Sequence, residues 1–195
     1  MSKLSKKKIA ITGTIGSGKS SVTKIIKEQY KTISADDIVK DLYNEKILIN
    51  QINKKILQKN NDFIDKEELA KIIFNDDLMK EKLESIVHPL VRNTISNWLE
   101  KNNGLLFVEV PLLYEAKFDD LFDLVIVVVT DEKKIVKRLM KDRGYSEVET
   151  LSRINHQLET KEKIKKADYL IYNNESFSQL ILNVKDVLKK IEVGE

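Results

Sequence analysis

Residues 13–20 carry the most restrictive pattern in the chain, GTIGSGKS, which is a glycine, four residues and then Gly-Lys-Ser. The apolar, β-branched segment 8–12 precedes it, and apolar residues follow it at helical spacing: Val22, Ile25 and Ile26. A strand, a glycine turn and a helix in this order form a phosphate-binding loop, in which backbone N–H groups and the helix N-terminus face phosphate oxygens. We therefore predict a P-loop within an α/β fold.

The chemistry of such a loop gives two side chains a role. Lys19 is predicted to reach the β and γ phosphates of a nucleotide, and the hydroxyl of Ser20 is predicted to bind Mg²⁺. The alternative is a glycine turn that only packs a strand against a helix and leaves Lys19 in solvent. Three of the six glycines lie in this loop, which favours phosphate binding.

The remaining apolar runs predict how the fold continues. Short runs of the kind buried on both faces of a parallel sheet predict four further strands: residues 32–35, 105–110, 124–129 and 169–172. Helical spacing predicts a helix at 133–140, a helix at 177–191 and, from the Ser146–Glu149 capping pattern, a helix that carries Arg153 and Gln157 on one face. Together these elements indicate a three-layer α/β fold with a parallel five-stranded sheet.

Residues 38–103 contain helical spacing and no run typical of a strand. We therefore predict a helical insertion there, and a core made of residues 1–37 and 104–195.

The composition narrows the function classes. The 34 Lys and Arg against 31 Asp and Glu leave a formal charge of +3, which demands neither nucleic acid nor an anionic membrane as a partner. With no cysteine, a disulfide framework, a thiolate metal site and a cysteine nucleophile are excluded. We expect a cytoplasmic protein without a targeting or membrane-spanning segment, because the apolar run before Gly13 is too short for either.

Two further places in the sequence are candidates for acceptor chemistry. Asp36 and Asp37 follow the predicted second strand, at the edge where parallel sheets bind ligands, and a carboxylate there could take a proton from an attacking hydroxyl. Both could instead cap the next helix. His88, Pro89 and Arg92 interrupt a helical pattern: Pro89 predicts a kink or a helix start, and Arg92 could contact a phosphate. The alternative is a simple helix junction.

Seven motifs in order resemble those of the dephospho-coenzyme A kinases and span most of the chain. They are residues 13–21, 33–36, 88–92, 110–115, 138–140, 153–157 and 167–173. The resemblance implies a nucleoside-monophosphate-kinase-like P-loop core, a helical acceptor-binding domain and a lid at about residues 138–165. The sequence departs from the family pattern at Ser34, where the family usually has Asp, and at Asp142-Arg143, where the family often has the reverse order.

The resemblance also implies site residues. Asp36 matches the aspartate that acts on the acceptor ribose 3′-hydroxyl, Glu109 the Walker B acidic position, and Arg138, Arg143 and Arg153 the lid. The catalytic residues implied are Asp36, Lys19, Arg138 and Arg143. The nucleotide-binding residues are Gly13, Thr14, Ile15, Gly16, Ser17, Gly18, Lys19, Ser20 and Ser21, with Asn173 near the adenine. The acceptor-binding residues are His88, Arg92, Pro111, Leu112 and Leu113, and Ser20 is the metal ligand.

These observations predict an enzyme that uses MgATP to phosphorylate dephospho-coenzyme A. The acceptor is expected to bind between the core and the insertion, and the enzyme is expected to be a monomer or weak homo-oligomer. Two alternatives stay open. One is another small-molecule P-loop kinase that acts on a nucleoside or nucleoside monophosphate. The other is an ATP-dependent switch or binding module, which slow hydrolysis and a protein partner would distinguish from a kinase.

Overall fold

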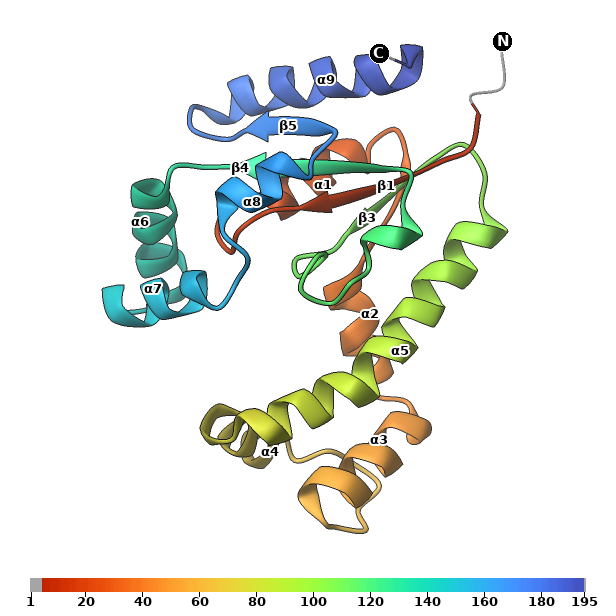
Figure 1. Ribbon diagram of the computed structural model, residues 1–195, viewed down its shortest axis with the longest axis vertical. Helices are drawn as coiled ribbons and strands as arrows, with labels where there is room; N and C mark the ends of the chain where they lie inside the picture. The colour runs from red at the N-terminus through yellow and green to blue at the C-terminus, as the bar shows by residue number, and fades with distance from the viewer. Residues whose placement is uncertain (1–4, 195) are drawn as a thin grey trace. The chain divides into compact units, whose positions relative to one another are not determined.

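The computed structural model describes residues 5–194 (Figure 1). It divides into two compact units. One contains the chain up to Ser34 and from Leu99 onward, and the other is Ala35–Trp98.

The first unit is built on a parallel sheet of five strands. These are β1 (Lys7–Thr12), β2 (Lys31–Ser34), β3 (Leu105–Glu109), β4 (Leu124–Val129) and β5 (Tyr169–Tyr172). Their order is β2-β3-β1-β4-β5, and Ile9 at the centre pairs with Phe107 on one side and Leu124 on the other. The predicted parallel five-stranded α/β fold is therefore confirmed. The second strand ends one residue earlier than predicted, because Ala35 begins a helix.

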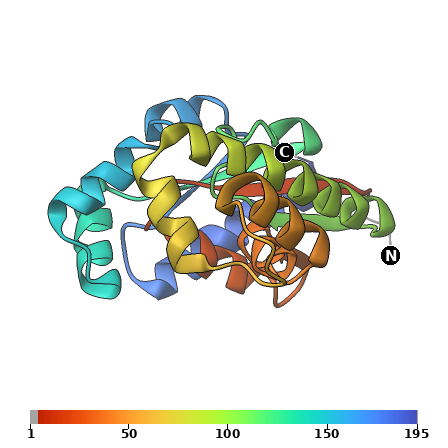
Figure 2. The ribbon, with the colours of Figure 1, turned by 90° about the horizontal axis from the view of Figure 1, so that it is seen from below.

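Helices cover both faces of this sheet. The helices α1 (Lys19–Ile26) and α9 (Phe177–Val193) lie on one face, and α8 (Thr160–Lys165) lies on the other (Figures 1 and 2). The core between α1, α9 and the sheet is wholly aliphatic and aromatic; it includes Ile9, Ile11, Val22, Ile26, Phe107, Ile126, Val128, Ile171, Val184 and Ile191. Since all strands run parallel, their carboxyl ends and the loops that follow them share one edge.

Beyond β4 the chain forms a pair of helices, α6 (Glu132–Arg143) and α7 (Glu147–Asn155), which lie side by side in both ribbon views (Figures 1 and 2). Gly144, at φ 68°, ends α6. The predicted capping box is present: Ser146 Oγ accepts from the Glu149 N–H, and the Glu149 carboxylate accepts from the Ser146 N–H. Because α7 ends at Asn155, the prediction that Gln157 shares its face with Arg153 is wrong.

The second unit contains α2 (Ala35–Leu42), α3 (Lys46–Ile52), the π-helical turn η1 (Asn53–Leu57), α4 (Lys66–Asn75) and most of α5 (Asp77–Lys101). The buried Asn53 amide donates to the carbonyls of Asn61 and Phe63, which orders the connection between η1 and α4. Pro89 lies inside α5, which begins at Asp77, so of the two predicted alternatives, a kink or a helix start, the helix start is excluded.

The short helix η2 (Asp119–Leu121) completes the connection between β3 and β4. Across residues 5–194, none of the helices has the length and apolar character that a bilayer crossing requires.

Candidate functional site

The P-loop lies between β1 and α1, as predicted, and its backbone is shaped by its glycines. Gly18 adopts φ 93°, and a Cβ there would stand 2.1 Å from the side-chain amide nitrogen of Asn173. Only glycine combines this backbone conformation with so close an approach. Within residues 5–194, the N–H groups of Gly16, Gly18 and Ser20 donate to no protein acceptor, so they are available to phosphate oxygens.

Lys19 is held inside this loop. Its side chain is buried, and Nζ donates to the carbonyl oxygens of Gly13 at 2.8 Å and Thr14 at 3.1 Å. The ammonium group therefore lies along the loop that binds phosphate, which excludes the alternative in which Lys19 is a solvated surface residue.

Ser20 and Glu109 come together at the end of the central strands. Ser20 Oγ, in the first turn of α1, donates to Glu109 Oε1 at 2.9 Å, and Glu109 is the last residue of β3. Glu109 is buried and sits where the family resemblance placed the Walker B carboxylate. A hydroxyl and a carboxylate side by side next to the P-loop form an all-oxygen pair of the kind that Mg²⁺ prefers.

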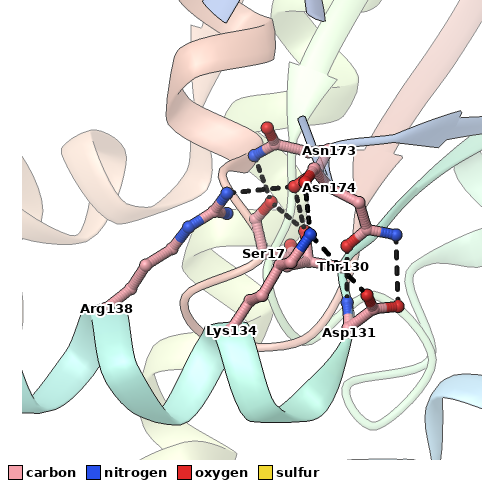
Figure 3. Close-up of polar contacts among 7 residues, drawn as sticks. All are labelled: Ser17, Thr130, Asp131, Lys134, Arg138, Asn173 and Asn174. Atoms are coloured by element: carbon pink, nitrogen blue, oxygen red, sulfur yellow. Dashed lines mark hydrogen bonds and ion pairs between the residues drawn. The ribbon is translucent and has the colours of Figure 1, made fainter. Parts of the chain in front are cut away.

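The loops after β4 and β5 meet the P-loop in one hydrogen-bond network (Figure 3). The Asn173 side chain donates to Ser17 O at 2.8 Å, and Thr130 Oγ1 donates to the same oxygen at 2.9 Å. From α6, Arg138 donates to Asn173 O at 3.0 Å (Figure 3). Asn173, which the resemblance placed near the adenine, is thus buried against the loop backbone.

Asn174 closes the outer side of this network. Its side chain exchanges two hydrogen bonds with Asp131, through the Asp131 N–H and carboxylate, and its carbonyl accepts from Lys134 (Figure 3). Sequence reasoning missed Thr130, Asp131 and Asn174. They follow β4 and β5 directly, so the rule that ligands gather at the carboxyl edge of a parallel sheet could have identified them.

The segment after α7 also contacts the P-loop. Gln157 Oε1 accepts from the Ile15 N–H at 2.8 Å, and the Thr160 and Thr14 hydroxyls lie 2.8 Å apart. Gln157 was assigned to a motif by resemblance without any role, and its contact with a P-loop amide was not predicted.

The loop after β3 holds the predicted acceptor residues Pro111, Leu112 and Leu113. Leu112 is exposed and Leu113 is fully buried, so the three side chains do not face one surface. The following residue, Tyr114, donates its hydroxyl to Lys166 O at 3.1 Å. Partial burial, with the nearby carboxylates, raises the pKa of Tyr114 to about 12, so the hydroxyl stays protonated at neutral pH.

The three arginines predicted for the lid lie in different environments. The guanidinium of Arg138 approaches the P-loop, with Nη1 3.9 Å from the position of a Cβ on Gly18. Arg143 is exposed at the end of α6, and Arg153 stacks over the Tyr145 ring at 4.4 Å. Of the three, the structure brings only Arg138 to the P-loop in the part of the chain it describes.

The remaining predicted site residues belong to the second unit. Asp36 and Asp37 lie in the first turn of α2, where the positive end of the helix dipole favours carboxylates. Asp36 is exposed, and Asp37 pairs with Lys40 at 2.7 Å. His88 and Arg92 lie one turn apart on α5, on the same side of the helix.

Comparison with known proteins gives a consistent result. The family profile described as dephospho-CoA kinase matches residues 7–179. The dephospho-CoA kinase of Oceanobacillus iheyensis is 36% identical over 95% of this chain and 98% of its own length. The dephospho-CoA kinase structure from Campylobacter jejuni superposes with a TM-score of 0.71 at 31% identity, covering 96% of this chain and 98% of that one. A shikimate kinase from Acinetobacter baumannii, at 14% identity and a TM-score of 0.60 over 97% of this chain and 94% of its own, shares the fold.

Proposed function

Because this chain belongs to the dephospho-CoA kinase family, we propose that its P-loop binds MgATP. In this proposal Lys19 acts on the nucleotide phosphates, and Asp36 acts on the acceptor hydroxyl that receives the phosphoryl group. The chain is an ATP-dependent phosphotransferase: it moves the γ-phosphoryl of ATP to the ribose 3′-hydroxyl of dephospho-CoA and yields CoA and ADP, the last step of coenzyme A biosynthesis. The observation that carries the residue assignment is the P-loop with Lys19 held inside it and Ser20 beside Glu109.

Mg²⁺ fits the oxygen atoms at the end of β3. Ser20 Oγ would coordinate the ion directly. Glu109 would either accept a hydrogen bond from a water molecule bound to the ion or coordinate the ion itself. Among residues 5–194 no group of three or more His, Cys, Asp or Glu side chains could hold a metal. Two protein oxygens suit an ion that takes its other ligands from water and the nucleotide. When bound, Mg²⁺ offsets negative charge on the β and γ phosphates.

Lys19 supplies the positive charge that lies beside the phosphoryl group during its transfer. Its ammonium donates to two loop carbonyls, and phosphate oxygens are stronger partners than carbonyls for an ammonium group. In phosphoryl transfer charge spreads over the equatorial oxygens, and a cation held in place stabilises this state more than the ground state.

Asp36 is assigned to the acceptor. It follows β2 by two residues, and its exposed carboxylate can accept a hydrogen bond from the ribose 3′-hydroxyl and orient its oxygen for in-line attack. His88 and Arg92, together with Pro111, Leu112 and Leu113, are assigned to acceptor binding. Asp37, already paired with Lys40, is the weaker candidate for the base.

The lid is assigned to residues 138–165. Arg138 already lies beside Gly18 and is the lid arginine assigned to the transferring phosphate, with Arg143 as a second cation when the lid closes. Asn173 donates a hydrogen bond to Ser17 O and so fixes the P-loop relative to the part of the site assigned to the adenine.

The proposal also covers the compartment, the oligomeric state and the macromolecular partners of the enzyme. We assign it to the cytoplasm, as a monomer or weak homo-oligomer that binds no nucleic acid. The support is the absence of cysteine and the near balance of 34 basic and 31 acidic residues. Light scattering of the purified chain, with and without DNA, tests the oligomeric state and the absence of nucleic-acid binding.

ADP release from MgATP tests the substrate assignment. The purified chain is assayed with dephospho-CoA, with a panel of nucleosides and nucleoside monophosphates, and without acceptor. Selective stimulation by dephospho-CoA is expected. Stimulation by another acceptor would support a different small-molecule kinase, and no stimulation would support a switch or binding module.

A further inference from the structure

The peptide group between Thr14 and Ile15 is bonded at both ends. Its N–H, on Ile15, donates to Gln157 Oε1 at 2.8 Å. Its C=O, on Thr14, accepts from the Ser17 N–H at 3.0 Å and from Lys19 Nζ at 3.1 Å. Hydrogen bonds at the two ends of this one peptide group therefore link Gln157 to Lys19.

The residue after Gln157 is held by an ion pair in which only the ammonium group is buried. This residue, Leu158, donates its N–H to Glu115 Oε1 at 2.8 Å, and Lys163 Nζ lies 3.0 Å from the same oxygen. Lys163 is 0% exposed, and its contact with Glu115 is electrostatic rather than a well-aligned hydrogen bond. A buried ammonium is costly unless a carboxylate stays beside it, so Lys163 fixes the Glu115 side chain and with it the backbone at Leu158.

We propose that Gln157 is a positioning residue of the phosphoryl transfer, that Glu115 holds it in place, and that it acts on Lys19 through the Thr14–Ile15 peptide group. The inference rests on the proposed function and adds to it residues that touch neither nucleotide nor acceptor. Glycine lies on both sides of this peptide, at Gly13 and Gly16, so the loop needs an external bond to keep one orientation. Holding the loop before ATP arrives removes part of the ordering cost of binding.

The first test compares nucleotide affinity among variants. Gln157→Met keeps the size of the side chain and removes the acceptor. The dissociation constant of the magnesium complex of β,γ-imido-ATP should rise about fivefold, the worth of one hydrogen bond. Glu115→Ala should give a similar rise. Because both changes act on one chain of contacts, the double variant should also stay near that value, well below the roughly 25-fold of independent effects.

Two further variants separate positioning from packing. Glu115→Gln combined with Lys163→Met removes both charges but keeps an oxygen that can accept from Leu158, so affinity should return to within about twofold of the parent. Lys185→Met, at an exposed position of α9 outside the residues assigned to the lid, is the control and should change nothing. If Glu115→Ala fails to fold, Gln157→Met and this charge-free pair still decide the question.

The readouts keep this inference distinct from the proposed function. Binding of the ATP analogue needs no acceptor, so it reports on Gln157 even if dephospho-CoA is not the substrate. At saturating ATP, kcat of Gln157→Met should fall by about the same factor as the affinity. Unchanged affinity and kcat in Gln157→Met, or multiplied effects in the double variant, would overturn the inference, whereas a parent chain inactive on dephospho-CoA would overturn the proposed function.

Discussion

At the scale of single residues, the site depends on a few side chains that meet the P-loop backbone. Lys19 bonds to Gly13 and Thr14, Asn173 bonds to Ser17, and Ser20 bonds to Glu109. The Lys19 contacts lie within the P-loop, and the other two join the P-loop region to the residue after β5 and to the end of β3, at the carboxyl edge of the sheet. The cost of changing these residues is therefore expected in turnover more than in folding.

Lys19→Met should lower kcat by about 100-fold or more, the usual cost of losing one donor placed for transition-state charge. Lys24→Met is the matched control, since Lys24 is exposed on the same helix. Both are checked by initial rates of ADP release at saturating dephospho-CoA, with circular dichroism to confirm folding. A Lys19→Met enzyme within threefold of the parent would contradict the role.

Gly18→Ala should abolish nucleotide binding, because the added Cβ would collide with Asn173 at 2.1 Å. Gly104→Ala is the control, because it introduces the backbone strain without the collision. Gly104 has a similar φ of +88° and nothing within 4 Å of its Cβ position. Both variants should lose about 1 kcal/mol or more of stability from the positive φ. Isothermal titration with MgADP should show binding only for Gly104→Ala, and equal binding by both would be evidence against the packing described.

At the scale of elements, the strands and helices followed from the sequence more closely than the site did. Continuous apolar runs identified β3 and β4 because both faces of a central strand are buried, whatever the partner. Spacing could not reveal that Gln157, beyond the end of α7, contacts Ile15, because Ile15 belongs to a distant part of the chain. For the same reason, Asn173 was placed near the adenine while its bond to Ser17 was not predicted.

The capping box of α7 gives a prediction about pH. Hydrogen bonds from the Ser146 backbone and hydroxyl, with the nearby Arg153 charge, hold the pKa of Glu149 below its usual value. A carboxylate with a lowered folded pKa stabilises the fold above its unfolded pKa and loses this effect as the pH falls through the folded value. The stability difference between the parent and Glu149→Gln should therefore be present at pH 7 and vanish as the pH falls through the lowered folded pKa.

Urea unfolding at several pH values checks this expectation, with Glu147→Gln as the control in the same helical turn. Ser146→Ala should lower the free energy of unfolding by about 1 kcal/mol at pH 7. A difference for Glu149→Gln that grows as the pH falls would contradict the sign of the pKa shift.

At the scale of the whole molecule, the two compact units share one continuous helix. The helix α5 begins in the second unit at Asp77 and ends in the first at Lys101, across the boundary between Trp98 and Leu99. We expect a helix that crosses this boundary to link the unfolding of the two units, because helix formation is cooperative.

The single tryptophan of the chain makes this linkage measurable, since Trp98 reports on the second unit while nucleotide binds the first. MgADP at about 100 times its dissociation constant should stabilise the first unit by about 2.7 kcal/mol. The denaturation midpoint seen by Trp98 fluorescence should rise together with that seen by circular dichroism. A Trp98 transition that does not move with nucleotide would show that the units unfold independently.

The most direct test of the account follows the labelled γ-phosphoryl of ATP into product. The parent chain and Asp36→Asn are mixed with γ-labelled MgATP and dephospho-CoA in a single turnover, and the product is separated and its phosphate position identified. Label is expected on the ribose 3′-oxygen of CoA with the parent chain, and at a rate at least 100-fold lower with Asp36→Asn. Label released as inorganic phosphate, or placed on another acceptor atom, would contradict it.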